Sequence, residues 1–205
     1  MKKIILFSLI LFTAIINSQE EKYVEESFYK IRAGMGLFIP QGQLNKYFGT
    51  SPFFDISSDF PFFGKNVFGI GVQFAIPTQK EEFTYLRTID TLKARSTFMA
   101  NIVFYLKKKI LEKEKSIVNF RLGIGASGIH TNARNPFYTG KDDENKYEII
   151  SSILINPSLE FVKKLKNKSE FIVALGIQYS PYRIEGAVKE DIGSTAMIPK
   201  ILFTF

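Results

Sequence analysis

The sequence predicts an all-β protein, an eight-stranded antiparallel up-and-down transmembrane β-barrel preceded by a signal peptide. Three observations lead to this prediction. Eight stretches alternate between apolar and polar residues with a period of two, the links between them are short and long in turn, and the N-terminus has the composition of an export signal.

The N-terminus predicts export. Lys2 and Lys3 precede a mainly apolar stretch, residues 4–16, and the polar Asn17-Ser18-Gln19 follows. This stretch is too short for a transmembrane helix and fits the hydrophobic region of a secretory signal peptide. We therefore expect a signal peptide at residues 1–18, a short periplasmic segment at 19–26 and an outer-membrane barrel at 27–205.

Eight stretches have the period of β-strands. In each, apolar or aromatic residues occupy every second position, with glycine, small polar or charged residues between them. Successive side chains of a strand point to opposite faces of its sheet, so each predicted strand has one apolar and one polar face. The stretches are residues 29–37, 54–62, 68–76, 97–106, 118–126, 153–161, 171–180 and 196–205.

The links support a barrel of this kind. Short polar turns are predicted at residues 64–66, 107–115 and 163–169, and longer segments at 41–51, 78–94, 131–147 and 185–193. Short periplasmic turns that alternate with longer extracellular loops are typical of outer-membrane barrels. No linker or low-complexity tract divides residues 27–205, which predicts one domain.

The chemistry of the two faces predicts which one is outside. The chain has 21 Phe and 9 Tyr, many of them on the apolar faces. An eight-stranded barrel has an interior only just wide enough for side chains, which cannot accommodate this volume. We therefore expect the apolar face to contact lipid and the polar face to line the lumen, with ring closure leaving no free strand edge.

Charged residues on the inner face are expected to pair, because an unpaired charge is costly in a poorly hydrated interior. A packed lumen closed by these pairs is favoured over a gated pore in so narrow a barrel. The predicted lumen charge network comprises Lys30, Arg32, Asp55, Asp59, Arg121, Glu160 and Lys200.

Each predicted strand also has a lipid-facing aromatic residue near its periplasmic end. Such rings collect at membrane interfaces. The predicted periplasmic aromatic girdle comprises Tyr29, Phe62, Phe68, Phe104, Phe120, Phe161, Phe171 and Phe205.

The last strand ends in Ile201, Phe203 and Phe205, with apolar residues at alternating positions up to a terminal aromatic. In this respect the chain resembles the small eight-stranded outer-membrane barrels (outer membrane protein A and X-like domains). It is also similar in size and pattern to PorT-like accessory barrels of gliding-type secretion systems. The resemblance implies a Gram-negative outer membrane, and that the barrel-assembly machinery reads these three residues as an assembly signal.

The charge is unevenly distributed. The net charge is +7, and the three short turns together have ten basic and two acidic residues, whereas residues 20–26 have four glutamates and one lysine. Two explanations account for the basic charge of these turns: they are solvated segments beside the membrane, or they are attracted to anionic lipid of the inner leaflet. Nucleic acid is not an expected partner of an exported barrel.

No cofactor or metal is expected. The letters GIGASG at residues 123–128 match a dinucleotide fingerprint, but they lie within a strand and no helix follows. His130 is the only histidine and the chain has no cysteine, which argues against a metal site. A lone histidine without a placed nucleophile or acid predicts interfacial packing rather than catalysis.

The sequence therefore favours a non-enzymatic role through contacts: envelope integrity, adhesion, or an accessory subunit of an outer-membrane or secretion complex. The stretches Pro136-Phe137-Tyr138 and Phe83-Thr84-Tyr85 are expected to expose aromatics to a protein partner. A passive channel for small or apolar solutes, as in OmpW-like barrels, is the alternative. A lipid-modifying enzyme based on His130 is the third hypothesis.

Overall fold

The computed structural model describes residues 29–62, 66–86, 91–140, 146–165, 169–184 and 190–204. These residues form β-strands almost throughout, with one short helix. The elements are β1 (Lys30–Pro40), α2 (Leu44–Tyr47), β2 (Phe48–Gly49), β3 (Ser51–Phe62), β4 (Asn66–Ala75), β5 (Thr78–Gln79), β6 (Phe83–Leu86), β7 (Thr91–Ala94), β8 (Ser96–Lys113), β9 (Ser116–Arg134), β10 (Tyr147–Lys164), β11 (Glu170–Ile184) and β12 (Glu190–Thr204).

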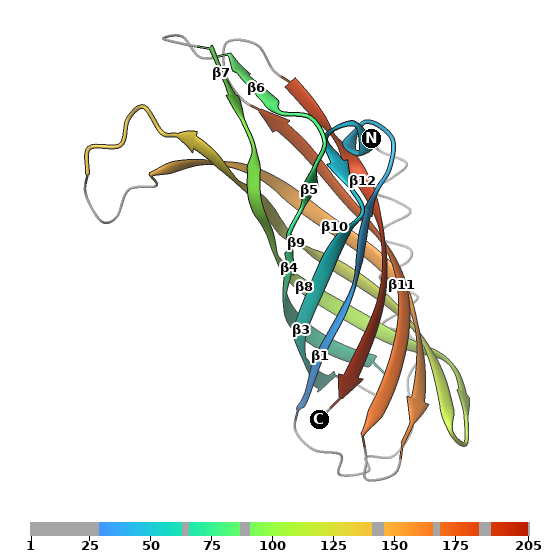
Figure 1. Ribbon diagram of the computed structural model, residues 1–205. Helices are drawn as coiled ribbons and strands as arrows, with labels where there is room; N and C mark the ends of the chain where they lie inside the picture. The colour runs from blue at the N-terminus through green and yellow to red at the C-terminus, as the bar shows by residue number, and fades with distance from the viewer. Residues whose placement is uncertain are drawn as a thin grey trace, which may run out of the picture.

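Eight strands form one antiparallel sheet that closes on itself (Figure 1). Their order around the ring is β1, β3, β4, β8, β9, β10, β11, β12, and β1 pairs with β12. The prediction of eight antiparallel strands in up-and-down order is therefore confirmed. The predicted signal peptide (1–18), the segment 19–26 and Phe205 lie outside the described residues.

The pairing register fixes the width of the ring. Ile31 of β1 pairs with Ser58, and the line of paired residues continues through β4, β8, β9, β10 and β11 to Thr195 of β12. Thr195 lies beside Gln41. One circuit of the ring that starts at Ile31 therefore returns to the chain at Gln41, a shift of ten residues along β1. This shift tilts the strands by about 40° and gives a backbone radius of about 8 Å. Side chains can fill an interior of that width.

The two faces of the ring differ as the alternation predicts. Met35 and Ile153 on the outer face are 65% and 61% exposed, whereas Asp55 and Arg121 on the inner face are 0% and 2% exposed. Among the described residues, no charged side chain occupies an outward position in the middle of the strands. Along the middle of the strands the apolar residues thus lie mostly outside, and most of the charged residues of the strands lie inside.

Two hairpins extend beyond the ring. We name the end at which β1 begins and β12 ends the lower end (Figure 1). The β8–β9 hairpin projects there, and its turn contains only residues 114–115, so the predicted turn over residues 107–115 is wrong. At the upper end β9 and β10 continue to Arg134 and Tyr147 and form an arm.

The upper end of the ring has an apolar core. Two of the predicted long loops contain α2, β2 and β5–β7, and they pack on ring residues such as Phe38 and Phe53. The ring of Phe83 lies 5.5 Å from that of Tyr47 and 5.6 Å from that of Phe48, and Phe83 is fully buried. The prediction that Phe83 is exposed is therefore wrong, because β6 folds over the opening and its aromatic residue joins the core.

Gly125 allows a close approach between β9 and β8. A Cβ atom at this position would lie 1.9 Å from the backbone oxygen of Ile102, whereas a Cβ at Gly128 would meet only a side-chain carbon at 3.5 Å. We expect Gly125→Ala to lower the free energy of unfolding by about 3 kcal/mol, because the backbone must shift.

The matched control is Gly128→Ala on the same strand, which should change the free energy of unfolding by about 0.5 kcal/mol or less. Urea titrations followed by circular dichroism measure both values. Equal effects of the two substitutions would contradict the close approach of β8 and β9.

Candidate functional site

The interior of the ring is divided into layers from the lower to the upper end. Buried charged side chains fill the lower half, and a polar layer follows in which the Asn101 amide donates to Gln73 and Gln178 at 3.2 Å. Ser127 donates to Asn101 at 2.5 Å. The apolar core described above lies beyond this layer, at the upper end.

Arg32 is at the centre of the charged layer. One terminal nitrogen lies 2.6 Å from Asp59 and 3.8 Å from Glu170, and the other donates to Glu160 at 3.0 Å. Lys107 donates to Asp59 and lies 3.8 Å from Glu160. These side chains are nearly inaccessible to solvent, so each cation needs its carboxylates.

Tyr105 and Arg121 complete this cluster. The Tyr105 hydroxyl donates to Asp59 at 2.6 Å and to the Ser58 carbonyl oxygen at 3.0 Å. The Arg121 guanidinium lies 3.9 Å from the centre of the Tyr105 ring, with its Nε 4.0 Å from Glu160. A guanidinium over an aromatic face gains a cation–π interaction, which is stronger when it is shielded from water.

A second ion pair lies further up the lumen. Lys200 donates to Asp55 at 2.6 Å, and the amide of Gln73 donates to the same carboxylate oxygen at 2.7 Å. The side chains of this pair are 1% and 0% exposed. The pair joins β3 to β12, which lie on opposite sides of β1 in the ring.

All seven residues of the predicted lumen charge network lie on the strands of the ring, but they do not form one network: Asp55 and Lys200 are a separate pair, and Lys30 is linked to the central cluster only through Glu170. Arg32, Asp59, Arg121 and Glu160 belong to the central cluster, Asp55 and Lys200 form the second pair, and Lys30 donates to Glu170 at 2.9 Å at the lower mouth.

Sequence reasoning missed three members: Lys107, Tyr105 and Glu170. Lys107 was assigned to a turn because it begins a run of three lysines. Lys107 lies two residues after Tyr105 and four after Val103, and both of those side chains point inward. The alternation of the strand therefore places Lys107 on the inner face, and this was the signal that could have identified it.

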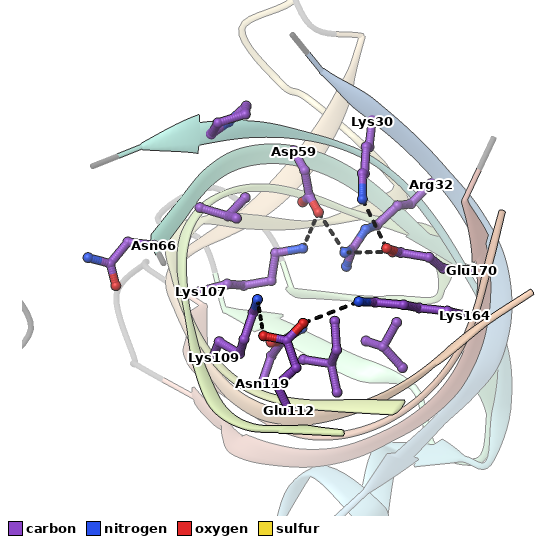
Figure 2. A pocket seen from close by; sticks show the side chains of 14 residues that line it. Lys30, Arg32, Asp59, Asn66, Lys107, Lys109, Glu112, Asn119, Lys164 and Glu170 are labelled. Carbon is purple, nitrogen blue, oxygen red and sulfur yellow. Dashed lines mark hydrogen bonds and ion pairs between the residues drawn. The ribbon is translucent and has the colours of Figure 1, made fainter. Parts of the chain in front are cut away.

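The lower mouth contains a cavity of about 180 Å³ (Figure 2). Lysines 30, 107, 109 and 164 line it together with Arg32, Asp59, Glu112, Glu170 and Asn119. Glu112 accepts hydrogen bonds from Lys109 at 2.8 Å and from Lys164 at 3.2 Å. These bonds, the one from Lys109 most of all, hold the pKa of the Glu112 carboxyl below its ordinary value.

Residues of the predicted aromatic girdle lie on the outer face. Tyr29, Phe62, Phe68, Phe104 and Phe161 are exposed there, and Phe120 and Phe171 are partly exposed. Phe104 of β8 pairs with Ile70, which lies two residues further up β4 than Phe68. Phe104 therefore lies further from the lower end than Phe68, the girdle residue of the neighbouring strand. Phe205 lies outside the described residues.

Ile201 and Phe203 of the predicted assembly signal also face outward, with 44% and 45% exposure. The Phe203 ring packs on Phe171 of the neighbouring strand, with centroids 5.2 Å apart.

His130 packs among aromatic residues near the upper end. Its ring stacks on Phe98 at 4.8 Å, and Tyr147 lies edge-on at 5.8 Å. The Thr97 hydroxyl lies 2.8 Å from Nδ1. Within the described residues no group of three or more His, Cys, Asp or Glu side chains could hold a metal ion.

No model of a known protein family matches this chain, and no curated protein matches it significantly. Among the described residues, no helix is long and apolar enough to span a membrane.

The buried pair Lys200–Asp55 provides a test of the charged layer. We expect Lys200→Met to lower the free energy of unfolding by about 3–5 kcal/mol, because it leaves a buried carboxylate without its cation. Adding Asp55→Asn should recover part of this loss, because the amide is uncharged. A double-mutant cycle from urea titrations at pH 7 measures the coupling.

The control is the exposed pair Lys46–Glu81, with a separation of 3.6 Å and side chains 55% and 56% exposed. Substituting both by alanine should give a coupling of about 0.5 kcal/mol or less. Additive effects at Lys200 and Asp55 would show that the pair does not stabilise the ring.

Proposed function

We propose that this protein is an integral β-barrel of a Gram-negative outer membrane that acts through contacts rather than by catalysis. Its role is envelope integrity, adhesion, or service as an accessory subunit of an outer-membrane or secretion complex. The observation that carries the proposal is the polarity of the ring, which has charged residues inside and an apolar outer face without charges along the middle of its strands.

The outer face has the extent of a membrane-spanning band. On β11 every outward position from Phe171 to Tyr179 is apolar or aromatic. At the tilt of this ring that length rises about 20 Å along the axis, close to the ~25 Å apolar band of outer-membrane barrels. Lys108 and Lys163 follow at the lower end of this face. A water-soluble protein rarely exposes so large an apolar surface.

The proposed location has support from the sequence. Residues 1–18 have the features of a signal peptide, which would deliver the chain across the inner membrane. The barrel-assembly machinery would then insert it, with Ile201, Phe203 and Phe205 as the recognised residues. Lipid of the outer membrane would cover the apolar face.

The filled interior supports a contact role over a channel. The charged cluster, the polar layer and the apolar core lie at successive levels within the ring. Val103, Leu154 and Tyr182 on the inner face are fully buried. A solute that crossed the barrel would have to separate buried ion pairs and also the core at the upper end.

The β9–β10 arm is the proposed contact surface. Phe137 near its tip is 82% exposed, and Tyr147 and Ile149 at the base of the arm are 37% and 44% exposed. Aromatic residues are enriched at protein interfaces, where a few of them provide most of the binding energy.

The channel alternative is tested by conductance. Because the interior is filled, we expect the purified barrel to give no resolved single-channel openings in planar bilayers. The folded state of the sample is verified by its faster migration in SDS gels before boiling than after boiling. Regular openings of a folded sample would favour passive transport over the contact role.

The contact role is tested by co-purification. A tagged copy extracted from outer membranes in mild detergent is expected to bring a stoichiometric protein partner with it. Phe137→Ala should reduce the recovered partner several-fold, because it removes an exposed aromatic side chain. The control Thr139→Ala, on the same arm, should leave recovery unchanged. A barrel that is recovered alone would contradict a subunit role, and equal recovery with both variants would exclude the arm as the contact surface.

A further inference from the structure

The cavity at the lower mouth is lined by more cations than carboxylates. Lysine side chains enter it from β1, β8 and β10 and point toward one another across the mouth (Figure 2). The cations among the described lining residues are Lys30, Arg32, Lys107, Lys109 and Lys164, and the carboxylates are Asp59, Glu112 and Glu170. Five cations against three carboxylates leave an excess of two positive charges.

The ion pairs deeper in the lumen do not cancel this excess. Glu160 lies 3.0 Å from Arg32 and 3.8 Å from Lys107, but Arg121 approaches the same carboxylate at 4.0 Å. Counting Glu160 together with Arg121 adds one charge of each sign. The excess of two positive charges at the mouth therefore remains.

Hydrogen-bond donors at the mouth also outnumber acceptors, because every lining carboxylate is shared. Each has two cations within 3.8 Å: Lys109 and Lys164 at Glu112, Lys30 and Arg32 at Glu170, and Arg32 and Lys107 at Asp59. Each ammonium group has three N–H donors. The buried Nε of Arg32 has no acceptor among the described residues. A ligand with several acceptor oxygens can use these donors.

The site is open at its rim and small. Lys30, Lys109 and Lys164 are partly exposed there, whereas Arg32 and Lys107 lie one inward position further into the ring and are buried. The cavity of about 180 Å³ is smaller than the pockets of about 300–1,000 Å³ that hold drug-sized ligands. Its size and charge suit a small anion that enters from the lower end.

Phosphate matches the site better than a carboxylate does. A phosphate monoester has a charge of about −1.5 to −2 at pH 7 and three strong acceptor oxygens. A carboxylate has a single negative charge and only two oxygens, so it would leave part of the positive excess unbalanced. Lysine binds phosphate as a point charge, and several lysines from different strands can therefore share one phosphate group.

We propose that the lower mouth is a binding site for a phosphate dianion, supplied as free phosphate or as the terminal group of a phosphate monoester. The ammonium groups of Lys30, Lys109 and Lys164 donate to its oxygens at the rim, and the positive charges of Arg32 and Lys107 attract it from deeper in the lumen. The site lies at the opposite end of the ring from the arm, so it does not depend on the proposed protein partner.

Equilibrium dialysis with radiolabelled inorganic phosphate tests the site directly. The full chain is folded in a phosphorus-free nonionic detergent at low salt, and its folded state is verified by the gel shift on boiling. We expect saturable binding of a single phosphate per barrel, which acetate at equal concentration does not displace. Glycerol phosphate that competes as well as free phosphate would identify a monoester as the ligand, and weaker competition would identify free phosphate.

The first variant combines Lys109→Met with Lys164→Met. It removes two ammonium groups from the rim and should weaken phosphate binding about tenfold. The matched control combines Lys108→Met with Lys163→Met, the adjacent residues on the same two strands, which do not line the cavity. Both double variants lose two positive charges, but the control should keep its affinity for phosphate.

Glu112→Gln provides a test that a loss of folding cannot imitate. It frees Lys109 and Lys164 from their shared carboxylate, so it should raise the affinity for phosphate several-fold. The proposal is overturned if the folded barrel binds no phosphate saturably, or if Glu112→Gln does not strengthen binding. Equal losses in the two double variants, or displacement of phosphate by acetate, would also overturn it, because binding would then depend on overall charge alone.

Discussion

The pairing of Arg32 and Lys107 with Asp59 and Glu160 is the interaction on which the rest of the structure depends. Four different strands, β1, β8, β3 and β10, supply these side chains. All four groups are buried in a ring of about 8 Å radius, where a charge without its partner is strongly destabilising. The pairs Arg32–Glu160 and Lys107–Asp59 join strands that are not neighbours in the sheet, so they constrain the register across the ring.

This constraint explains the distribution of the other residues. Long charged side chains in a narrow lumen leave little space, so Gly69 lies against the Tyr105 ring and Gly123 lies against Val103. Most aromatic and aliphatic residues along the middle of the strands therefore face outward, and the largest group of apolar residues inside lies at the upper end. The apolar outer face, on which the proposed membrane location rests, is thus a consequence of the same packing that fills the lumen. A filled lumen in turn directs the proposed function toward the outer surfaces of the barrel and toward its arm.

Much of the fold follows from residue alternation, because a period of two assigns each side chain to one face whatever the detailed strand ends are. The same rule places Arg32, Asp55 and Glu160 inside. The prediction was wrong at Lys107, where the lysine-rich composition was given more weight than the alternation. The surroundings of Lys107 resemble a turn, although its side chain points inward as the alternation requires.

The partners of the inward charges could not be predicted, because pairing depends on the ten-residue shift of the ring and not on local sequence. Nor could the burial of Phe83, which arises when two long loops of irregular sequence fold together over the upper opening. The height of Phe104 along the barrel axis could not be predicted for the same reason. Strand tilt displaces paired residues of neighbouring strands relative to one another along this axis.

The proposed arrangement places the apolar face against lipid and the charged face around a closed interior. Nitroxide labels attached to single cysteines along β10, from Ile153 to Phe161, test it most directly in lipid vesicles, because the chain has no other cysteine. Labels at the odd positions should collide with dissolved oxygen as lipid-exposed sites do, and labels at the even positions should be shielded from oxygen. Strong collisions of the odd positions with a water-soluble nickel complex would contradict it, because they would place the apolar face in water.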